Sequence, residues 1–376
     1  MTPFTLAVPE GEIADLKTRL ALTRFPDAAP GEPWAYGASV DYMRELTAYW
    51  RDEFDWRAAE ARLNAFPQFM TEIEGTKIHF LKVDGKGPNP IPLLLCHGWP
   101  GSVYEFLDII PRLTDPAAFG GDPTDAVTVI APSLPGYGLS FNPGKRYGLD
   151  EMADLLAKLM AALGHDRYAL QGGDWGCFVT SRIAHDHPDR AIGLHLNMMP
   201  LRREKDMVTN PTEEERVYLD QLAHFLKEET GYQWIQGTKP QTLAHGLNDS
   251  PMGLAAWIVE KFRTWSDCGG DVESVHSKDA LLANISLYWF TGAIGSSFWP
   301  YYARLHAPWP IEGAITVPTA YSAFPTEILR PPRSLAERVY KDIRQWTVQP
   351  KGGHFAAMEQ PKALAKDVLA FLRLVR

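Results

Sequence analysis

An aspartate flanked by glycines carries the strongest chemical signal in the chain. Residues 172–176 read Gly-Gly-Asp-Trp-Gly, after an apolar run that predicts a strand and before a segment that predicts a helix. This context is typical of a nucleophile elbow, with Asp174 at the position where serine is usual. Glycine suits positions 172 and 176 because strand and helix approach so closely there that a Cβ atom would collide. A plain turn with a capping aspartate is the competing interpretation.

An aspartate nucleophile limits the reactions that the site can catalyse. Serine attacking a saturated carbon would form an ether, which a site of this type could not hydrolyse, whereas a carboxylate forms an ester. Water activated by a base can then attack the carbonyl carbon of that ester, and an oxyanion hole stabilises the tetrahedral intermediate. Asp174 therefore indicates displacement at saturated carbon, such as epoxide opening or dehalogenation, and not ordinary ester hydrolysis.

A second turn is suited to an oxyanion hole. Residues 97–101 read His-Gly-Trp-Pro-Gly and directly follow the expected strand 92–96. In hydrolases with a nucleophile elbow this turn supplies one backbone amide of the oxyanion hole, and the residue after the nucleophile supplies the other. We therefore assign the backbone amides of Trp99 and Trp175 to it. A Gly/Pro turn with a structural histidine would give the same pattern.

The general base is predicted at His354, in the Gly-Gly-His-Phe turn at 352–355 between the last expected strand and the last expected helix. A loop at the carboxyl end of a strand is where this architecture places its histidine. The chain order nucleophile, acid, histidine requires an acid between the elbow and this turn. We favour Glu327, which follows the expected strand 314–320. Spacing alone leaves three other carboxylates open: Asp342, Glu204 and Asp206.

The leaving group separates epoxide opening from dehalogenation. A halide leaves as a stable anion and needs only weak donors such as indole N–H groups, whereas an epoxide oxygen leaves as a basic alkoxide and needs a general acid. Tyrosine, with a pKa of about 10, stays protonated at neutral pH and can donate. A pair of tyrosines above the aspartate would therefore indicate an epoxide, although most tyrosines are core aromatics. The candidates are Tyr218, Tyr232, Tyr288, Tyr301 and Tyr302.

The elements around these residues predict an α/β fold. Short apolar runs alternate with amphipathic segments, which favours a parallel sheet covered by helices. The expected strands are 92–96, 127–131, 168–171, 192–198, 314–320 and 343–348, and the expected helices between them are 103–113, 149–163 and 175–185.

Two segments break this alternation. The first 75 residues read as helices rather than as part of a sheet, and residues 201–305 are helical and rich in Trp and Tyr, as in an inserted cap. We therefore divide the chain into four parts: an N-terminal extension (1–75), the first part of the core (76–200), the cap (201–305) and the second part of the core (306–376).

Composition excludes several classes of protein. The 376 residues include 37 basic and 46 acidic ones, a net charge of −9 without a basic cluster, so no nucleic acid partner is expected. The three cysteines lie far apart, and the chain has no CxxC, metal or nucleotide motif, so we expect neither metal nor another cofactor. A reducing, cytoplasmic setting is expected. The chain has neither the roughly 18 apolar residues of a membrane span nor a signal peptide, so we expect no membrane anchor.

Taken together, the motifs resemble one family across nearly the whole chain. The chain is similar to the epoxide hydrolases of the α/β-hydrolase fold, specifically the microsomal-type branch with an N-terminal extension. The segments that carry this resemblance are HGWPGS (97–102), LPGYGLS (134–140), GGDWG (172–176), the long stretch 231–262, AFPTEI (323–328) and GGHFAAMEQP (352–361).

The resemblance implies roles for individual residues. It implies Asp174 as nucleophile, His354 as base and Glu327 as its partner, with Tyr232 as one donor to the epoxide oxygen. The second donor is implied near the end of the cap, where the alignment favours Tyr301 over its neighbour Tyr302. The family's extension is expected to wrap the core and tie down the cap.

The resemblance also implies the reaction and its partners. The substrate would be a small apolar or aromatic epoxide, which water converts to a vicinal diol. Membrane-bound members carry an apolar N-terminal anchor, whereas this chain begins directly with the extension, which implies a soluble enzyme. Two alternatives remain, a haloalkane dehalogenase with the same elbow and a ligand-binding receptor that has lost the chemistry. The sequence leaves a homodimer open.

Overall fold

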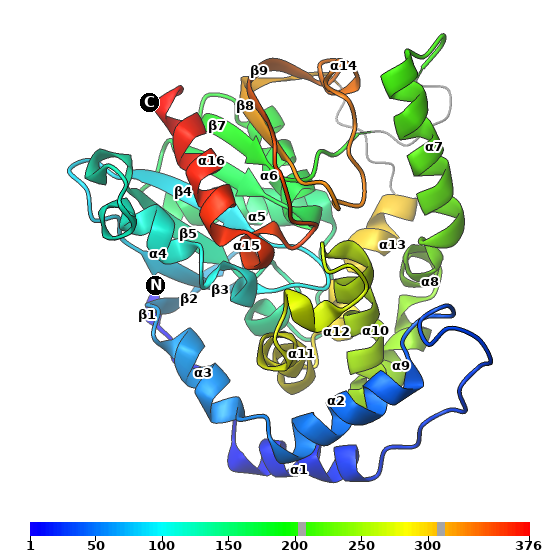
Figure 1. The fold of residues 1–376 in the computed structure, drawn as a ribbon. Coiled ribbons are helices and arrows are strands. Elements are labelled where there is room, and N and C mark those ends of the chain that lie inside the picture. Colours follow the sequence, from blue (N-terminus) through cyan, green and yellow to red (C-terminus); the bar gives the residue numbers. More distant parts are fainter. Residues whose placement is uncertain (202–207, 307–312) are drawn as a thin grey trace.

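The computed structural model describes residues 1–201, 208–306 and 313–376. A nine-stranded sheet forms its centre, with helices on both faces and a second group of helices at the lower right of Figure 1. Among the described residues, no helix has the length and apolar character needed to cross a bilayer. The strands are β1 (Thr2–Pro3), β2 (Gln68–Ile73), β3 (Thr76–Val83), β4 (Ile91–Cys96), β5 (Val127–Pro132), β6 (Tyr168–Gly172), β7 (Ala191–Leu196), β8 (Ile315–Ala323) and β9 (Tyr340–Val348).

The helices fall into three groups along the chain. Those before and within the first part of the core are α1 (Glu10–Ala21), α2 (Val40–Asp52), α3 (Trp56–Asn64), α4 (Ile110–Thr114), α5 (Leu149–Ala162) and α6 (Asp174–Asp186). The cap consists of α7 (Glu213–Glu228), α8 (Gly231–Thr238), α9 (Pro240–Asp249), α10 (Pro251–Trp265), α11 (Lys278–Thr291), α12 (Ile294–Ser297) and α13 (Trp299–His306). The last group is α14 (Arg333–Ala336), α15 (Ala356–Glu359) and α16 (Pro361–Arg373).

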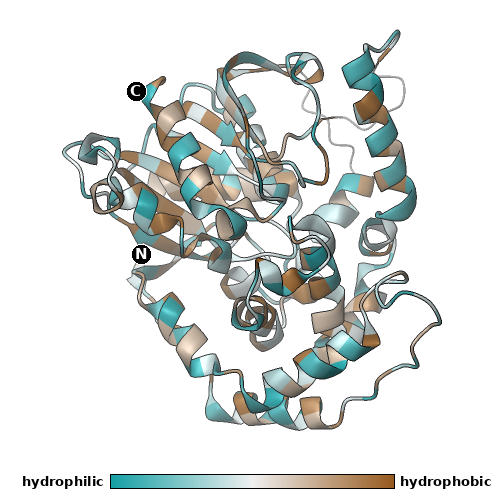
Figure 2. Cartoon of the chain, viewed as in Figure 1, coloured by the Kyte–Doolittle hydropathy of each residue, from teal (hydrophilic) through white to brown (hydrophobic). Residues whose placement is uncertain are grey.

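The sheet order is β1-β2-β3-β5-β4-β6-β7-β8-β9. The six strands from β4 to β9 run parallel, and they are the six strands that the sequence predicts. Parallel strands are covered on both faces, which explains why β5 is buried at every residue and why apolar residues run along the central strands in Figure 2. Helices α5 and α6 pack together on one face, and α4 and α16 pack together on the other (Figure 1).

The antiparallel edge of the sheet is a correction to the sequence analysis. The first 75 residues are not only helical, because they contribute β1 and β2, and β2 pairs with β3 as a hairpin. The hairpin turns at Glu74 and Gly75, which both have positive φ (49° and 71°), as a two-residue type I′ turn requires. This arm is only partly buried, so its apolar alternation is weak and the strand is hard to recognise.

The predicted helix 103–113 is also corrected. The chain forms a 3₁₀ turn at Val103–Phe106 and then starts α4 at Ile110. Pro111 explains the break, because in the interior of one continuous helix its ring would clash with a carbonyl of the preceding turn. In the observed arrangement this proline lies in the first turn of α4, where it is tolerated.

Helix α2 of the N-terminal segment is bonded to α11 of the cap. The Trp50 indole N–H donates to the hydroxyl of Ser286 at 3.1 Å, and both residues are buried. Closer to solvent, the Tyr49 hydroxyl donates to Asp279 at 2.9 Å, and Lys278 forms an ion pair with Glu45 at 2.6 Å. The N-terminal helices therefore hold a cap helix as well as adding strands to the sheet.

Candidate active site

Asp174 occupies a sharp turn between β6 and α6. Its φ of 46° lies in the left-handed region, which is costly for a residue with a side chain and persists only where the surroundings fix it. The neighbouring glycine at 176 allows that turn, because a Cβ there would collide with the backbone carbonyl of Cys96 at the end of β4. The strand, turn and helix predicted for this motif are therefore observed, and they project the carboxylate at the carboxyl ends of the strands.

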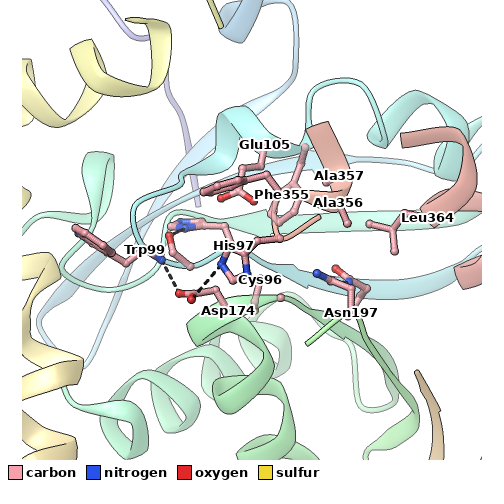
Figure 3. Close-up of a pocket in the computed structure, with 15 residues that line it drawn as sticks. Cys96, His97, Trp99, Glu105, Asp174, Asn197, Phe355, Ala356, Ala357 and Leu364 are labelled. Carbon is pink, nitrogen blue, oxygen red and sulfur yellow. Dashed lines mark hydrogen bonds and ion pairs between the residues drawn. The ribbon is translucent and has the colours of Figure 1, made fainter. Parts of the chain in front are cut away.

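The Asp174 carboxylate has a different partner at each oxygen. The backbone N–H of Trp99 donates to Oδ1 at 2.8 Å (Figure 3), and Oδ2 lies 3.3 Å from Nε2 of His354. The Asp174 side chain is 15% exposed, so a ligand can still reach it. Trp175 lies in the first turn of α6, where backbone N–H groups have no acceptor within the helix.

His354 lies between two carboxylates. Its Nδ1 is 2.7 Å from Oε1 of Glu327, and both side chains are almost completely buried. Burial by itself lowers the pKa of His354, but the Glu327 and Asp174 carboxylates outweigh it and the pKa lies well above the ordinary value of histidine. The imidazolium form is therefore favoured while both neighbours are charged.

Two loops bring His354 and Glu327 together. Glu327 follows β8 and His354 follows β9, and a parallel bridge between Thr326 and Gly353 joins the two loops. Of the other acids that spacing left open, Asp342 lies on β9 and pairs with Arg344 at 2.8 Å. Glu204 and Asp206 lie outside the described residues.

Tyr232 of α8 and Tyr301 of α13 lie together above the elbow. Their ring centroids are 5.6 Å apart, and the rings lie 5.3 and 5.8 Å from the ring of Trp99, whose backbone binds Asp174. Tyr301 also contacts Trp175 at 4.7 Å. Burial, the charge on Tyr232 and then that on Asp174 hold the pKa of Tyr301 well above 10, so its hydroxyl stays protonated at neutral pH.

The other candidate tyrosines lie elsewhere. Tyr302 stacks on Trp299 and His306, with ring centroids 4.6 and 4.0 Å away. The Tyr288 hydroxyl donates to the carbonyl of Gly101 at 2.8 Å and so braces the turn after β4. Tyr218 is a buried residue of α7.

His97 has a structural role in the turn that carries Trp99. Burial lowers its pKa to about 4, so the ring is neutral at ordinary pH. Its Nε2 accepts the backbone N–H of Leu134 at 3.1 Å, and Nδ1 can therefore donate to the carbonyl of Gly98 at 3.0 Å. The ring thus fixes the turn against the loop after β5.

Sequence reasoning missed polar residues that line a pocket beside Asp174. Glu105 reaches it from the 3₁₀ turn after β4, Asn197 from the end of β7 and Gln171 from β6. The only sequence signal at Glu105 is the Ser-Val-Tyr-Glu run at 102–105. This run is typical of the first residues of a helix, so it suggests a helix-capping role for Glu105 rather than a place in a functional site.

Fold and site together define a class of protein. A mostly parallel sheet carries an aspartate at a strand-to-helix elbow, an oxyanion-type backbone donor from the turn after β4, and a buried histidine–carboxylate pair from the last two loops. This is an α/β-hydrolase with an aspartate at the strand-to-helix elbow, covered by helices α7–α13.

Comparisons with known proteins give the family. Residues 1–106 match the model described as epoxide hydrolase N terminus, and residues 91–232 match the α/β-hydrolase fold. A relative from Stigmatella aurantiaca (strain DW4/3-1) is 44% identical over 100% of this chain and 86% of its own. Epoxide hydrolase 1 of Oryctolagus cuniculus is 38% identical over 99% of this chain and 89% of its own. The structure of Aspergillus niger epoxide hydrolase matches with a TM-score of 0.88 at 32% identity, covering 100% of this chain and 96% of that one.

The chain therefore belongs to the epoxide hydrolase family, and it is an enzyme that hydrolyses epoxides with water. The fold and the family expected from the sequence are confirmed.

Proposed function

We propose that this epoxide hydrolase acts through an ester on Asp174. Oδ2 attacks a ring carbon of the epoxide, the carbon–oxygen bond of the ring breaks, and Tyr232 and Tyr301 bind and protonate the departing oxygen. The observation that carries the proposal is that one carboxylate has a backbone donor at Oδ1 and a histidine at Oδ2, below a pair of tyrosines. A carboxylate held in this way can attack with one oxygen while the other stays bound.

The second step returns the enzyme to its starting state. Water attacks the ester carbonyl carbon and gives a proton to Nε2 of His354, while the Trp99 and Trp175 amides stabilise the oxyanion. The bond from Asp174 to the substrate oxygen then breaks, and the departing oxygen takes the proton from His354. The second hydrogen of the water leaves the new Asp174 carboxyl group and reprotonates the tyrosine, so that the carboxylate and the tyrosine pair are both restored. Ester formation itself prepares this step, because it removes the Asp174 charge that favours the imidazolium and so lowers the pKa of His354 toward that of a usable base.

Glu327 would orient His354 and stabilise its cationic form. It holds Nδ1 at 2.7 Å, which leaves Nε2 facing Asp174. A buried carboxylate beside an imidazolium is an effective electrostatic partner because little water screens the pair.

The substrate is proposed to be a small apolar or aromatic epoxide, and the product a vicinal diol. Aromatic rings support this class: Trp99 contacts Tyr232, Tyr301, Phe298 and Trp265, with ring centroids between 5.3 and 6.3 Å apart. An aromatic wall favours apolar ligands, with the tyrosine hydroxyls as the polar groups that fix their orientation.

Variants of Asp174 and His354 test this mechanism. Asp174→Ala removes the nucleophile and should abolish turnover, whereas His354→Gln should form the ester but not hydrolyse it. Mass spectrometry of intact His354→Gln protein after incubation with an aryl epoxide should show an increase equal to the mass of the epoxide. Steady turnover by Asp174→Ala, or no mass increase in His354→Gln, would contradict the mechanism.

Glu327→Gln and its control Asp342→Asn test which carboxylate is the partner of His354. Loss of the Glu327 charge should reduce kcat by about 10²- to 10⁴-fold, the range typical of groups that support a general base. Asp342→Asn removes an exposed carboxylate paired with Arg344 and should leave kcat unchanged. A large loss of kcat in Asp342→Asn would contradict the assignment.

A further inference from the structure

Gln233 of α8 is bonded to one of the two tyrosines that the proposed mechanism uses. Its side-chain amide N–H donates to the hydroxyl oxygen of Tyr232 at 2.8 Å. Helix α8 packs against α13, which carries Tyr301 (Figure 1). Gln233 is half-buried, whereas both tyrosines are buried. The glutamine is therefore a direct partner of Tyr232 from the edge of the site.

This hydrogen bond has two consequences for Tyr232. A hydroxyl oxygen that accepts an N–H cannot direct its own hydrogen at that donor, so the O–H of Tyr232 points away from Gln233. The bond also becomes stronger when the oxygen is charged, because hydrogen bonds to ionised groups are stronger than those between neutral groups. Gln233 therefore favours the charged form of Tyr232 at the moment when its proton leaves.

A buried cation acts on Tyr232 in the same direction. The ammonium of Lys261 in α10 lies 4.8 Å from the centre of the Tyr232 ring, and the Lys261 side chain is only 8% exposed. Lys261 also forms an ion pair with Glu260, which offsets part of its charge. A cation in a poorly hydrated place still attracts a nearby tyrosinate, because little water screens the pair.

Tyr301 has the opposite surroundings. Burial, and then the charges on Tyr232 and Asp174, hold its pKa well above 10. The Trp175 indole N–H lowers this pKa slightly, but it does not reach the geometry of a hydrogen bond to any described residue. The guanidinium of Arg304, on the same helix as Tyr301, lies over the Trp175 ring at 5.9 Å. The two hydroxyls thus differ in how well their surroundings accept a negative charge.

We propose that Gln233 is the positioning residue that makes Tyr232 the tyrosine that gives its proton to the epoxide oxygen, whereas Tyr301 only donates a hydrogen bond to that oxygen. The inference rests on the proposed ester mechanism and adds a division of roles within the tyrosine pair. It is specific to the side chain at position 233, since Tyr232 and Tyr301 alone would leave the two hydroxyls interchangeable.

The step is balanced without a further reactant. Oδ2 of Asp174 bonds to a ring carbon, and the electron pair of the broken carbon–oxygen bond goes to the epoxide oxygen, which takes the proton of Tyr232. The negative charge is then on the Tyr232 oxygen, beside the Gln233 amide. The second hydrogen of the water that hydrolyses the ester later restores the Tyr232 hydroxyl.

The pH dependence of ester formation tests which tyrosine gives the proton. Single turnovers of an aryl epoxide, stopped by rapid acid quench and followed by mass spectrometry of the intact enzyme, give the rate constant of ester formation from neutral to alkaline pH. This rate constant should fall where the proton-donating tyrosine ionises. The fall should disappear in Tyr232→Phe and remain in Tyr301→Phe, and the reverse result would overturn the inference.

Several other titratable groups surround Tyr232, so the fall must be assigned with variants. From the packed elements these are Tyr301 of α13, with its ring 5.6 Å away, Lys261 and Glu260 of α10, Asp174 of the elbow, and His354, whose ring contacts the Trp265 ring that Tyr232 also contacts. Tyrosine and lysine have ordinary pKa values of about 10, whereas the carboxyl groups are already charged at neutral pH.

Gln233→Met tests the glutamine itself, because methionine keeps the length of the side chain and removes the N–H donor. Without this donor the charged form of Tyr232 is less favoured. Ester formation at neutral pH should therefore slow by up to about tenfold, and the fall should move upward by about one pH unit, the effect of one hydrogen bond to a charged oxygen. Gln233→Glu, which places a carboxylate there, should move the fall in the same direction.

Gln236→Leu is the matched control on the same helix. Gln236 is completely buried and accepts the Trp257 indole N–H at 3.1 Å, so its hydrogen bond does not involve Tyr232. This variant should lower stability but leave the pH of the fall unchanged. An unshifted fall in Gln233→Met, or an equal shift in Gln236→Leu, would overturn the inference while leaving the ester mechanism intact. Absence of ester in the wild type and in every variant would overturn the ester mechanism and the inference with it.

Discussion

At the scale of single residues, this enzyme depends on groups whose charge states change one another. His354 is most basic while Asp174 and Glu327 are both charged, and in the proposed mechanism esterification of Asp174 removes one of these charges. The proposed role of Tyr232 and Tyr301 places the opposite requirement on them, because a proton donor must stay protonated until the alkoxide forms. Burial of Tyr301 next to Tyr232 and Asp174 meets it by disfavouring tyrosinate.

The tyrosine pair gives the first prediction at this scale. Tyr232→Phe and Tyr301→Phe should each slow ester formation by about 10²-fold or more, because each removes one donor to the epoxide oxygen. Tyr302→Phe, next to Tyr301 but stacked on Trp299 and His306, should leave ester formation unchanged. Single-turnover measurements of the three variants decide the point. Equal losses in Tyr301→Phe and Tyr302→Phe would contradict the pairing of Tyr232 with Tyr301.

The sequence predicts those candidate site residues whose motifs lie within a few neighbouring residues of the chain. Asp174 lies in a motif whose glycines are required by the turn itself, and the turn that carries Trp99 directly follows a recognisable strand. Glu327 needed the family resemblance, because several acids have compatible spacing. Glu105 could not be found, since its cavity exists only where β4, β6, β7 and the last loop meet.

At the scale of elements, the central parallel strands such as β4 and β5 were predictable because burial makes their sequences almost continuously apolar. The half-buried strand β2 was not predictable, because its sequence shows little alternation between apolar and polar residues. The helix break at Pro111 was not predictable either, because it depends on where the chain begins a new helix. The contact between α2 and α11 also lies beyond sequence reasoning, since its partners are 236 residues apart.

That contact gives a prediction at the same scale. Trp50→Phe should lower the free energy of unfolding by about 1–3 kcal/mol, because it leaves the buried Ser286 hydroxyl without its indole donor. Tyr49→Phe removes a neighbouring hydrogen bond to Asp279 that faces solvent, and it should change stability by less than about 0.5 kcal/mol. Denaturant unfolding of both variants provides the comparison. A larger effect in Tyr49→Phe would show that the buried bond does not tie α2 to α11.

At the scale of the whole molecule, the N-terminal segment joins the sheet and the cap into one folded unit, and neutral histidines are buried within that unit. Burial lowers the pKa of His79 to about 3, with a smaller contribution from His97, and lowers the pKa values of His97 and His276 to about 4. These rings take up protons in the unfolded chain near pH 6.5 but not in the folded protein. Since the unfolded state then binds more protons at these three rings, their contribution to stability falls as the pH decreases from about 6.5 to 4.

A variant of His79 measures how much one buried histidine contributes to the pH dependence of stability. With a pKa of about 3 when folded and about 6.5 when unfolded, it should account for about 2 kcal/mol of the stability lost between pH 7 and pH 5. His79→Gln will be less stable at pH 7, because it disturbs contacts with Ser133 and Gln68, but it should lose about 2 kcal/mol less than the wild type on acidification. Replacement of the exposed His224 by Gln is the control. Equal losses in the wild type and His79→Gln would contradict this account.

The central claim is that the first oxygen transferred to the substrate comes from Asp174. A single turnover of an aryl epoxide in ¹⁸O-labelled water, with enzyme in excess, tests it most directly. The ester mechanism predicts that the diol of this first turnover contains only unlabelled oxygen and that the label appears in the Asp174 carboxylate. Labelled diol in the first turnover would mean that water attacks the epoxide directly, and Asp174 would then not be the nucleophile.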